Sequence, residues 1–141
     1  MGKDTEFKEN VKVQGFKDIT KEIEPKKLYH PDKVFEKDTT VIVFESSSSG
    51  DRKTHIGEMI QFFSYIVPNT KWEKCYYVLY LCGEPDEKNE FDRLQSIYDS
   101  FPFSKNNREK IAAICIQDQP SNEELRELTI EKITKLNKLL L

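Results

Sequence analysis

The chain has 141 residues, with 22 basic and 25 acidic side chains, so its formal net charge is −3. This length suggests one domain spanning residues 1–141, and a hydrophobic content of 37% with nine Phe and six Tyr suffices for one core. The composition excludes disorder throughout, and the acidic balance excludes a protein that holds nucleic acid by bulk positive charge. Any nucleic-acid function must rest on a local site.

No apolar run approaches the roughly 18 to 20 residues that span a bilayer, and the N-terminus has no hydrophobic signal region. We therefore expect a cytoplasmic protein with no membrane partner. Cys75, Cys82 and Cys115 are an odd number of cysteines without paired CxxC spacing. In a reducing compartment they are predicted to be small buried thiols.

The first predicted elements are an irregular segment and a hairpin. Residues 1–25 are polar, and we expect them to be irregular apart from a short helix over 19–23. Strands are predicted at 27–36 and 39–48, around a polar turn at 36–38. The second strand contains a continuous apolar, β-branched run, which is typical of a central strand buried on both faces.

Helices and strands alternate after the hairpin. The predicted elements are a helix over 51–67, a strand over 75–82, a helix over 89–101, a strand over 110–117 and a helix over 121–140. Ser121 with Glu124 forms the capping box that begins the last helix. This order predicts an α/β sandwich, with a mixed central β-sheet flanked by helices.

Two carboxylates in the hairpin are the first candidates for chemistry. Asp32 follows Pro31 in the first strand, and Glu45 ends the apolar run of the second. Folding the hairpin can bring them close together, and a buried glutamate is costly unless it is paired or binds a cation. Two converging carboxylates, with waters and a phosphate oxygen, are what Mg²⁺ or Mn²⁺ requires.

At these residues the sequence resembles the PD-(D/E)XK nuclease superfamily. Pro31-Asp32 matches its Pro-Asp, Glu45 matches its (D/E)XK glutamate, and Gln61 with Tyr65 resembles its QxxxY element. The resemblance covers about residues 27–82 and implies a restriction-endonuclease-like three-layer sandwich, whose core is helix, three-stranded meander, helix, strand. It also implies an Mg²⁺-dependent or Mn²⁺-dependent endonuclease of the type II restriction-like class that cleaves DNA, with the metal on Asp32 and Glu45.

The motif lysine is absent from its usual place. Ser47 stands two residues after Glu45, where the superfamily has the lysine that orients or deprotonates the attacking water. Lys53, at the start of the following helix, is the nearest substitute. Glu58 and His55 are further candidates for proton transfer or for a second metal.

Other polar residues near these motifs are candidates for substrate binding. We expect Arg52 to contact phosphate, with Ser47 and His55 near the substrate. Gln61 and Tyr65 share a polar stripe with Glu58 on the predicted helix. That stripe is either an ordinary solvated face or the wall of a catalytic cleft.

The expected partners are DNA and either a second copy of the chain or a larger recognition subunit, because no separate recognition domain is evident. Leu139–Leu141 at the end of an amphipathic helix fit a dimer contact. The alternative is a catalytically inactive nuclease fold that serves as a binding or assembly module, which Ser47 favours and the retained carboxylates oppose. A small-molecule enzyme is a third possibility, without any recognisable cofactor motif.

Overall fold

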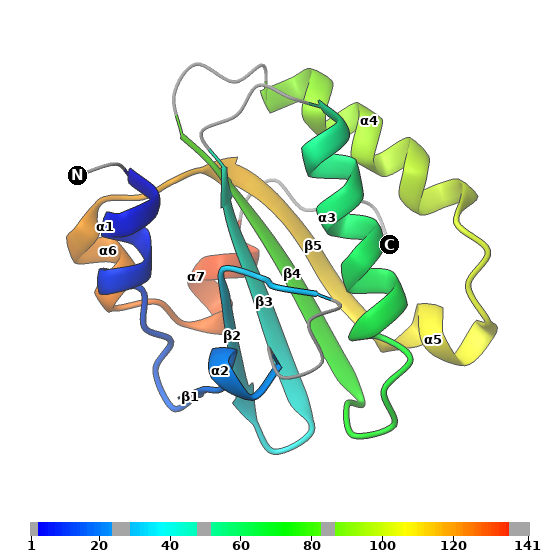
Figure 1. Ribbon diagram of the computed structural model, residues 1–141, viewed down its shortest axis with the longest axis horizontal. Helices are drawn as coiled ribbons and strands as arrows, with labels where there is room; N and C mark the ends of the chain where they lie inside the picture. The colour runs from blue at the N-terminus through cyan, green and yellow to red at the C-terminus, as the bar shows by residue number, and fades with distance from the viewer. Residues whose placement is uncertain (1–2, 24–28, 48–51, 83–86, 136–141) are drawn as a thin grey trace.

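The structure, a computed structural model, describes residues 3–23, 29–47, 52–82 and 87–135. It is an α/β protein with a five-stranded mixed open sheet and helices on both faces of that sheet (Figure 1). Among the described residues, no helix is long and apolar enough to cross a membrane. All three cysteines are buried and form no disulfide bond, as the sequence predicts.

The elements follow one another in a simple order. The strands are β1 (Lys17–Asp18), β2 (Lys33–Lys37), β3 (Thr40–Ser47), β4 (Lys74–Leu81) and β5 (Ile111–Asp118). The helices are α1 (Lys3–Asn10), α2 (Thr20–Ile23), α3 (Arg52–Tyr65), α4 (Glu87–Ser100), α5 (Lys105–Lys110), α6 (Asn122–Arg126) and α7 (Ile130–Thr134).

The sheet has the strand order β1-β2-β3-β4-β5, so each strand pairs with its neighbours in sequence. β2 is antiparallel to β1 and β3, whereas β3, β4 and β5 are parallel. This confirms the predicted hairpin and the parallel strands that follow it. Lys33 pairs with Phe44, which places Asp32 beside Glu45 at the edge where the parallel strands end.

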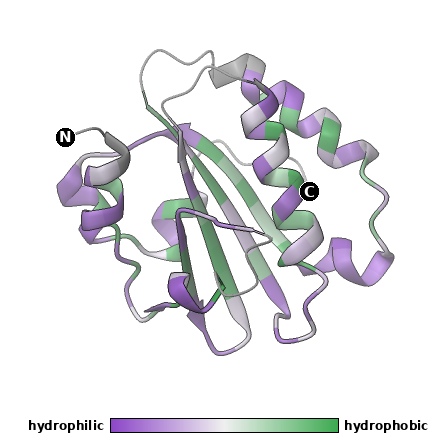
Figure 2. Cartoon of the chain, viewed as in Figure 1, coloured by the Kyte–Doolittle hydropathy of each residue, from purple (hydrophilic) through white to green (hydrophobic). Residues whose placement is uncertain are grey.

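Alternating side chains of β3 enter two separate cores. Val41 and Val43 pack in the core that also contains Met59 of α3, whereas Phe44 packs in the core that contains Phe7 of α1 and Leu125 of α6. Figure 2 shows the resulting hydrophobic centre of the sheet beneath helices with hydrophilic outer faces. Burial on both faces explains why the apolar run of β3 is continuous and not alternating.

Helix α1 lies where the sequence predicts an irregular N-terminal segment. The helix has almost no amphipathic pattern, because Phe7 is its one fully buried side chain among the residues whose burial is described. The Phe7 ring packs 5.9 Å from that of Phe44 and 5.8 Å from that of Tyr80. A single anchor of this kind gives no periodic signal, so the helix was not predictable from spacing. The short helix predicted over 19–23 is confirmed as α2.

The prediction of one long helix over 121–140 is wrong within the described residues. Two short helices, α6 and α7, replace it. The backbone amides of Lys12 and Gln14 donate to the carbonyls of Leu125 and Leu128, both at 2.9 Å. These carbonyls would be acceptors inside a continuous helix, so pairing with the N-terminal segment interrupts it, and Thr129 caps the new helix.

Other element boundaries differ from the predicted ones by smaller amounts. β2 begins at Lys33, later than predicted, and the hairpin turn lies at 38–39, where Asp38 has a φ of 54°. Helix α5 was not predicted, because its six residues are polar and none is buried. The predictions for 24–28, 48–51 and 136–141, including the leucine contact, lie outside the described residues.

Ser121 begins α6 with the predicted capping box. Its hydroxyl accepts from the amide of Glu124 at 3.2 Å, and its own amide donates to the Glu124 carboxylate at 3.3 Å. We expect Ser121→Ala to lower the free energy of unfolding by about 1 kcal/mol, measured by urea denaturation. Ser96→Ala, on the exposed face of α4, is the control, and an equal effect of both variants would contradict the capping role.

Candidate metal centre

Glu45 is a buried carboxyl group at the end of the central strand. Glu45 is 3% exposed, and its side chain lies on the same face of β3 as Val43, the face that α3 covers. Burial, together with the charges of Glu58 and Asp32, raises the pKa of Glu45 to about 9, against the smaller opposing effect of Lys8. The ionised form of Glu45 therefore lacks a sufficient countercharge among the described residues.

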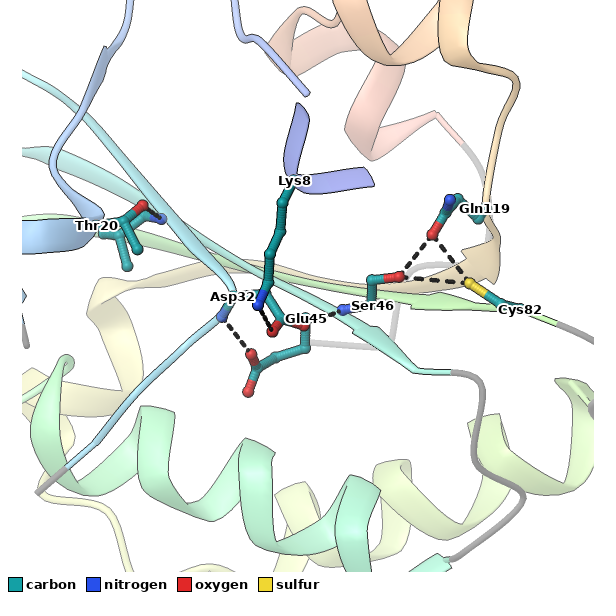
Figure 3. A network of polar contacts seen from close by, with 8 residues as sticks. Lys8, Thr20, Asp32, Glu45, Ser46, Cys82 and Gln119 are labelled. Atoms are coloured by element: carbon teal, nitrogen blue, oxygen red, sulfur yellow. Dashed lines mark hydrogen bonds and ion pairs between the residues drawn. The ribbon is translucent and has the colours of Figure 1, made fainter. Parts of the chain in front are cut away.

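Asp32 joins the start of β2 to the end of β3. Its backbone amide donates to Glu45 Oε1 at 2.8 Å, and its Oδ2 accepts from the amide of Ser46 at 2.8 Å. Lys8 Nζ lies 3.7 Å from Asp32 Oδ1. Figure 3 shows Lys8 reaching from α1 to Asp32, while the Glu45 carboxylate turns toward α3. The hairpin thus places Asp32 beside Glu45, with the Asp32 amide as the group that meets the Glu45 side chain.

Two tyrosine hydroxyls complete the surroundings of these carboxylates. Tyr29 and Tyr77 are buried, and neither hydroxyl has a hydrogen-bond partner within the part of the chain that the structure describes. Burial and the charge of Glu45 are the leading causes that raise the pKa of both phenols well above the ordinary value. Buried polar atoms of this kind normally meet water or an ion, so they mark a place for one beside Glu45.

The described ranges contain no complete set of metal ligands. No group of three or more His, Cys, Asp or Glu side chains within them is placed so that it could hold a metal ion. Mg²⁺ usually takes only one or two carboxylates from the protein, with waters and substrate phosphate in its other positions. Glu45 is one such carboxylate, and Asp32 and Glu58 are close enough to raise its pKa.

A second polar cluster lies beside the first, where β3, α3 and α4 meet. His55 Nε2 lies 2.9 Å from Ser47 Oγ, and His55 Nδ1 lies 2.8 Å from Glu90 Oε2. Arg93 pairs with the other oxygen of Glu90. Ser47 and His55, both candidates from the sequence, are therefore brought together by a direct contact.

The remaining candidates lie along α3. Lys53 is in the first turn, after Arg52, and its side chain is exposed. Gln61 is exposed, and Tyr65 is 46% exposed while its ring stacks on that of Tyr29 at 6.3 Å. The polar stripe of the helix thus faces solvent at these two residues, and Tyr65 extends it toward the tyrosine that borders Glu45.

An open cleft lies next to Asp32, between α1 and the start of β2. Its volume is about 550 Å³. Several basic side chains line it beside the acidic ones, including Lys8, Lys21, His30 and Lys33. One of these, Lys33, pairs with Asp18 at 2.9 Å. The three lysines of the lining are matched by three acidic residues, Asp18, Glu22 and Asp32, so the cleft brings basic groups close to Asp32 without a net positive charge.

Five residues of the carboxylate and histidine clusters were not identified from the sequence, namely Lys8, Tyr29, Tyr77, Glu90 and Arg93. Lys8 and Glu90 lie 24 and 58 residues from Asp32 in the chain, and their contacts depend on how α1 and α4 pack. Tyr77 belongs to an apolar run and is indistinguishable there from a core aromatic, and Tyr29 lies in a mostly polar stretch without a pattern that marks it. No motif spacing could have singled them out.

Comparisons of the chain with family models, with curated proteins and with solved structures found no match.

Proposed function

We propose that this chain is a metal-dependent phosphodiester hydrolase with a restriction-endonuclease-like fold, and that it cleaves DNA. The observation that carries the proposal is Glu45, a buried carboxyl group that is held beside two further carboxylates at the carboxyl edge of a mixed sheet. Such an arrangement is unfavourable without a cation and favourable with one. Buried carboxylates with raised pKa values are characteristic of functional sites.

The order of the elements supports this choice of fold. Helix α1, the antiparallel meander β1-β2-β3, helix α3 and strand β4 follow the order that the sequence resemblance implies, with the short helix α2 inserted between β1 and β2. Asp32 immediately precedes the second meander strand, and Glu45 lies near the end of the third. These positions support the assignment of the two carboxylates to the proposed nuclease site.

The residues of the site have separable tasks in this proposal. Asp32 and Glu45 would hold Mg²⁺ or Mn²⁺, with Glu58 next to them, and the bound ion would neutralise charge at the phosphate and lower the pKa of a water molecule. The tyrosine hydroxyls hydrogen-bond the surrounding water. Lys8 and Lys21 in the cleft neutralise phosphates of the DNA backbone, which carries affinity without sequence information.

Cleavage of plasmid DNA tests the function. Incubation of supercoiled plasmid with the protein and Mg²⁺ or Mn²⁺ is expected to yield nicked and linear forms, and EDTA is expected to abolish them. Ca²⁺ is expected to support DNA binding without rapid cleavage. If neither Mg²⁺ nor Mn²⁺ supports cleavage over a range of salt and protein concentrations, the proposal is contradicted.

A non-catalytic binding module is the second candidate. It is favoured by Ser47 in the place of the motif lysine and by the exposed position of Lys53. This candidate predicts that the protein binds DNA with equal affinity in EDTA and in Mg²⁺, as measured by a mobility-shift assay, and that it does not cleave the DNA. A metal requirement for binding would exclude this candidate.

A further inference from the structure

We propose that Ser47, His55 and Glu90 form a proton relay that accepts the proton of the attacking water. This inference rests on the proposed phosphodiester hydrolysis and assigns the base of that reaction. The cluster supplies an ordered chain of a hydroxyl, an imidazole and a carboxylate, which is the arrangement that activates an O–H group in many hydrolases.

The geometry of the relay is complete at both nitrogens of His55. Nε2 lies 2.9 Å from Ser47 Oγ, and Nδ1 lies 2.8 Å from Glu90 Oε2. The relay requires the tautomer in which Nδ1 donates to the Glu90 carboxylate and Nε2 accepts from the serine hydroxyl. His55 is 1% exposed and Glu90 is 7% exposed, so water does not compete strongly for either bond.

The relay lies next to the carboxylates of the candidate metal centre. Ser47 is two residues beyond Glu45 in β3, so the two side chains share a face of the strand about 7 Å apart. His55 and Glu58 are likewise one helical turn apart in α3. Ser47 thus offers a hydroxyl where the sequence lacks the expected lysine.

The chemical step balances without another reactant. The water oxygen forms a bond to phosphorus while its proton passes to Ser47 Oγ, and the serine's own proton passes to His55 Nε2. The bond from phosphorus to the leaving oxygen breaks, that oxygen keeps the electron pair, and solvent protonates it. Glu90 stabilises the imidazolium cation, which then returns its proton through the Ser47 hydroxyl.

Glu90→Gln tests the relay through a structural readout as well as activity. Arg93 donates to one oxygen of Glu90, so it is expected to retain the amide oxygen of the variant and to turn the amide NH₂ toward His55. His55 would then carry its proton on Nε2 and could no longer accept from Ser47. Nitrogen-15 NMR of the metal-free protein distinguishes the two tautomers, and with only two histidines, His30 and His55, the assignment is direct.

We expect the tautomer to change from Nδ1–H to Nε2–H in Glu90→Gln and cleavage to fall about 100-fold, while Mn²⁺ affinity stays within twofold of wild type. Asp92→Asn, an exposed acid-to-amide change in the same helix, should alter neither. Ser47→Ala should reduce cleavage at least tenfold, with Ser47→Thr restoring most of it.

Two results would overturn the relay while leaving the proposed function intact. One is a wild-type His55 that carries its proton on Nε2. The other is a cleavage rate within threefold of wild type in both Glu90→Gln and Ser47→Ala. A wild-type protein that cleaves no DNA would instead refute the proposed function, and the relay with it.

Discussion

Glu45→Gln is expected to raise the free energy of unfolding by roughly 2 to 4 kcal/mol at pH 8 in EDTA, while it abolishes cleavage of DNA. Burial and the charges of Glu58 and Asp32 make ionised Glu45 unfavourable in the folded chain. Glutamine resembles the protonated form, because its amide oxygen can still accept from the amide of Asp32. It removes the charge that a cation would need.

The stability of the wild type should depend on pH because the pKa of Glu45 is raised in the folded chain. Glu45 has a pKa of about 9 in the folded chain and an ordinary value of 4.5, so between these values the folded state holds a proton that the unfolded chain has lost. The free energy of unfolding of the wild type should therefore fall as pH rises from 4.5 to 9, and the gain from Glu45→Gln should shrink toward zero near pH 4.5.

Chemical denaturation at pH 5 and pH 8 measures this effect. Glu109→Gln, at an exposed position of α5, is the matched control and should change stability by less than 0.5 kcal/mol. A loss of stability in Glu45→Gln at pH 8 would mean that Glu45 serves the fold as an ion pair and not as a ligand. Equal cleavage by the variant and the wild type would remove Glu45 from the site.

Two substitutions of Asp32 are expected to distinguish its structural role from its catalytic role. Asp32→Ala removes the acceptor of the Ser46 amide and should destabilise the protein by about 1 to 3 kcal/mol, with cleavage reduced roughly 100-fold or more. Asp32→Asn keeps an acceptor oxygen, so it should retain more stability than the alanine variant and yet lose as much activity. The unfolding midpoint and the plasmid cleavage rate measure the two effects.

Asp92→Ala, at an exposed position of α4, should leave both measurements unchanged. If Asp32→Asn cleaved DNA at the wild-type rate, the carboxylate would act only as the acceptor that holds β2 to β3. The metal ligands would then have to be sought around Glu45 and Glu58 alone.

The sheet could be predicted because its signals are local. The apolar run of β3 and the period of α3 identify both elements, and the short turn fixes the hairpin. Asp32 and Glu45 could be paired from that hairpin alone, because antiparallel register places them side by side. Their neighbourhood therefore needed no long-range information.

The rest of the site depends on packing between distant segments. Lys8 reaches Asp32 only because Phe7 anchors α1 against β3 and β4. Glu90 reaches His55 only because α4 lies beside α3. A charged residue in a polar helix carries no sign of its partner, so these contacts are visible only in three dimensions.

The formal charge of −3 is compatible with DNA as a substrate under this account. The basic side chains of the cleft lie next to Asp32, and the metal adds the positive charge that the chain lacks at the phosphate. Affinity for DNA should accordingly be weak without a divalent cation and should fall with rising salt. A second copy or a partner subunit remains the proposed source of sequence recognition.

Anomalous diffraction from crystals soaked in MnCl₂ tests whether Glu45 is a metal ligand. We expect an anomalous peak bonded to the Glu45 carboxylate and to a carboxylate oxygen of Asp32 or Glu58 in the wild type, and its loss in Glu45→Gln. A wild type whose Glu45 remains bonded to the Asp32 amide, with no manganese beside it at saturating MnCl₂, would show that Glu45 does not bind the metal.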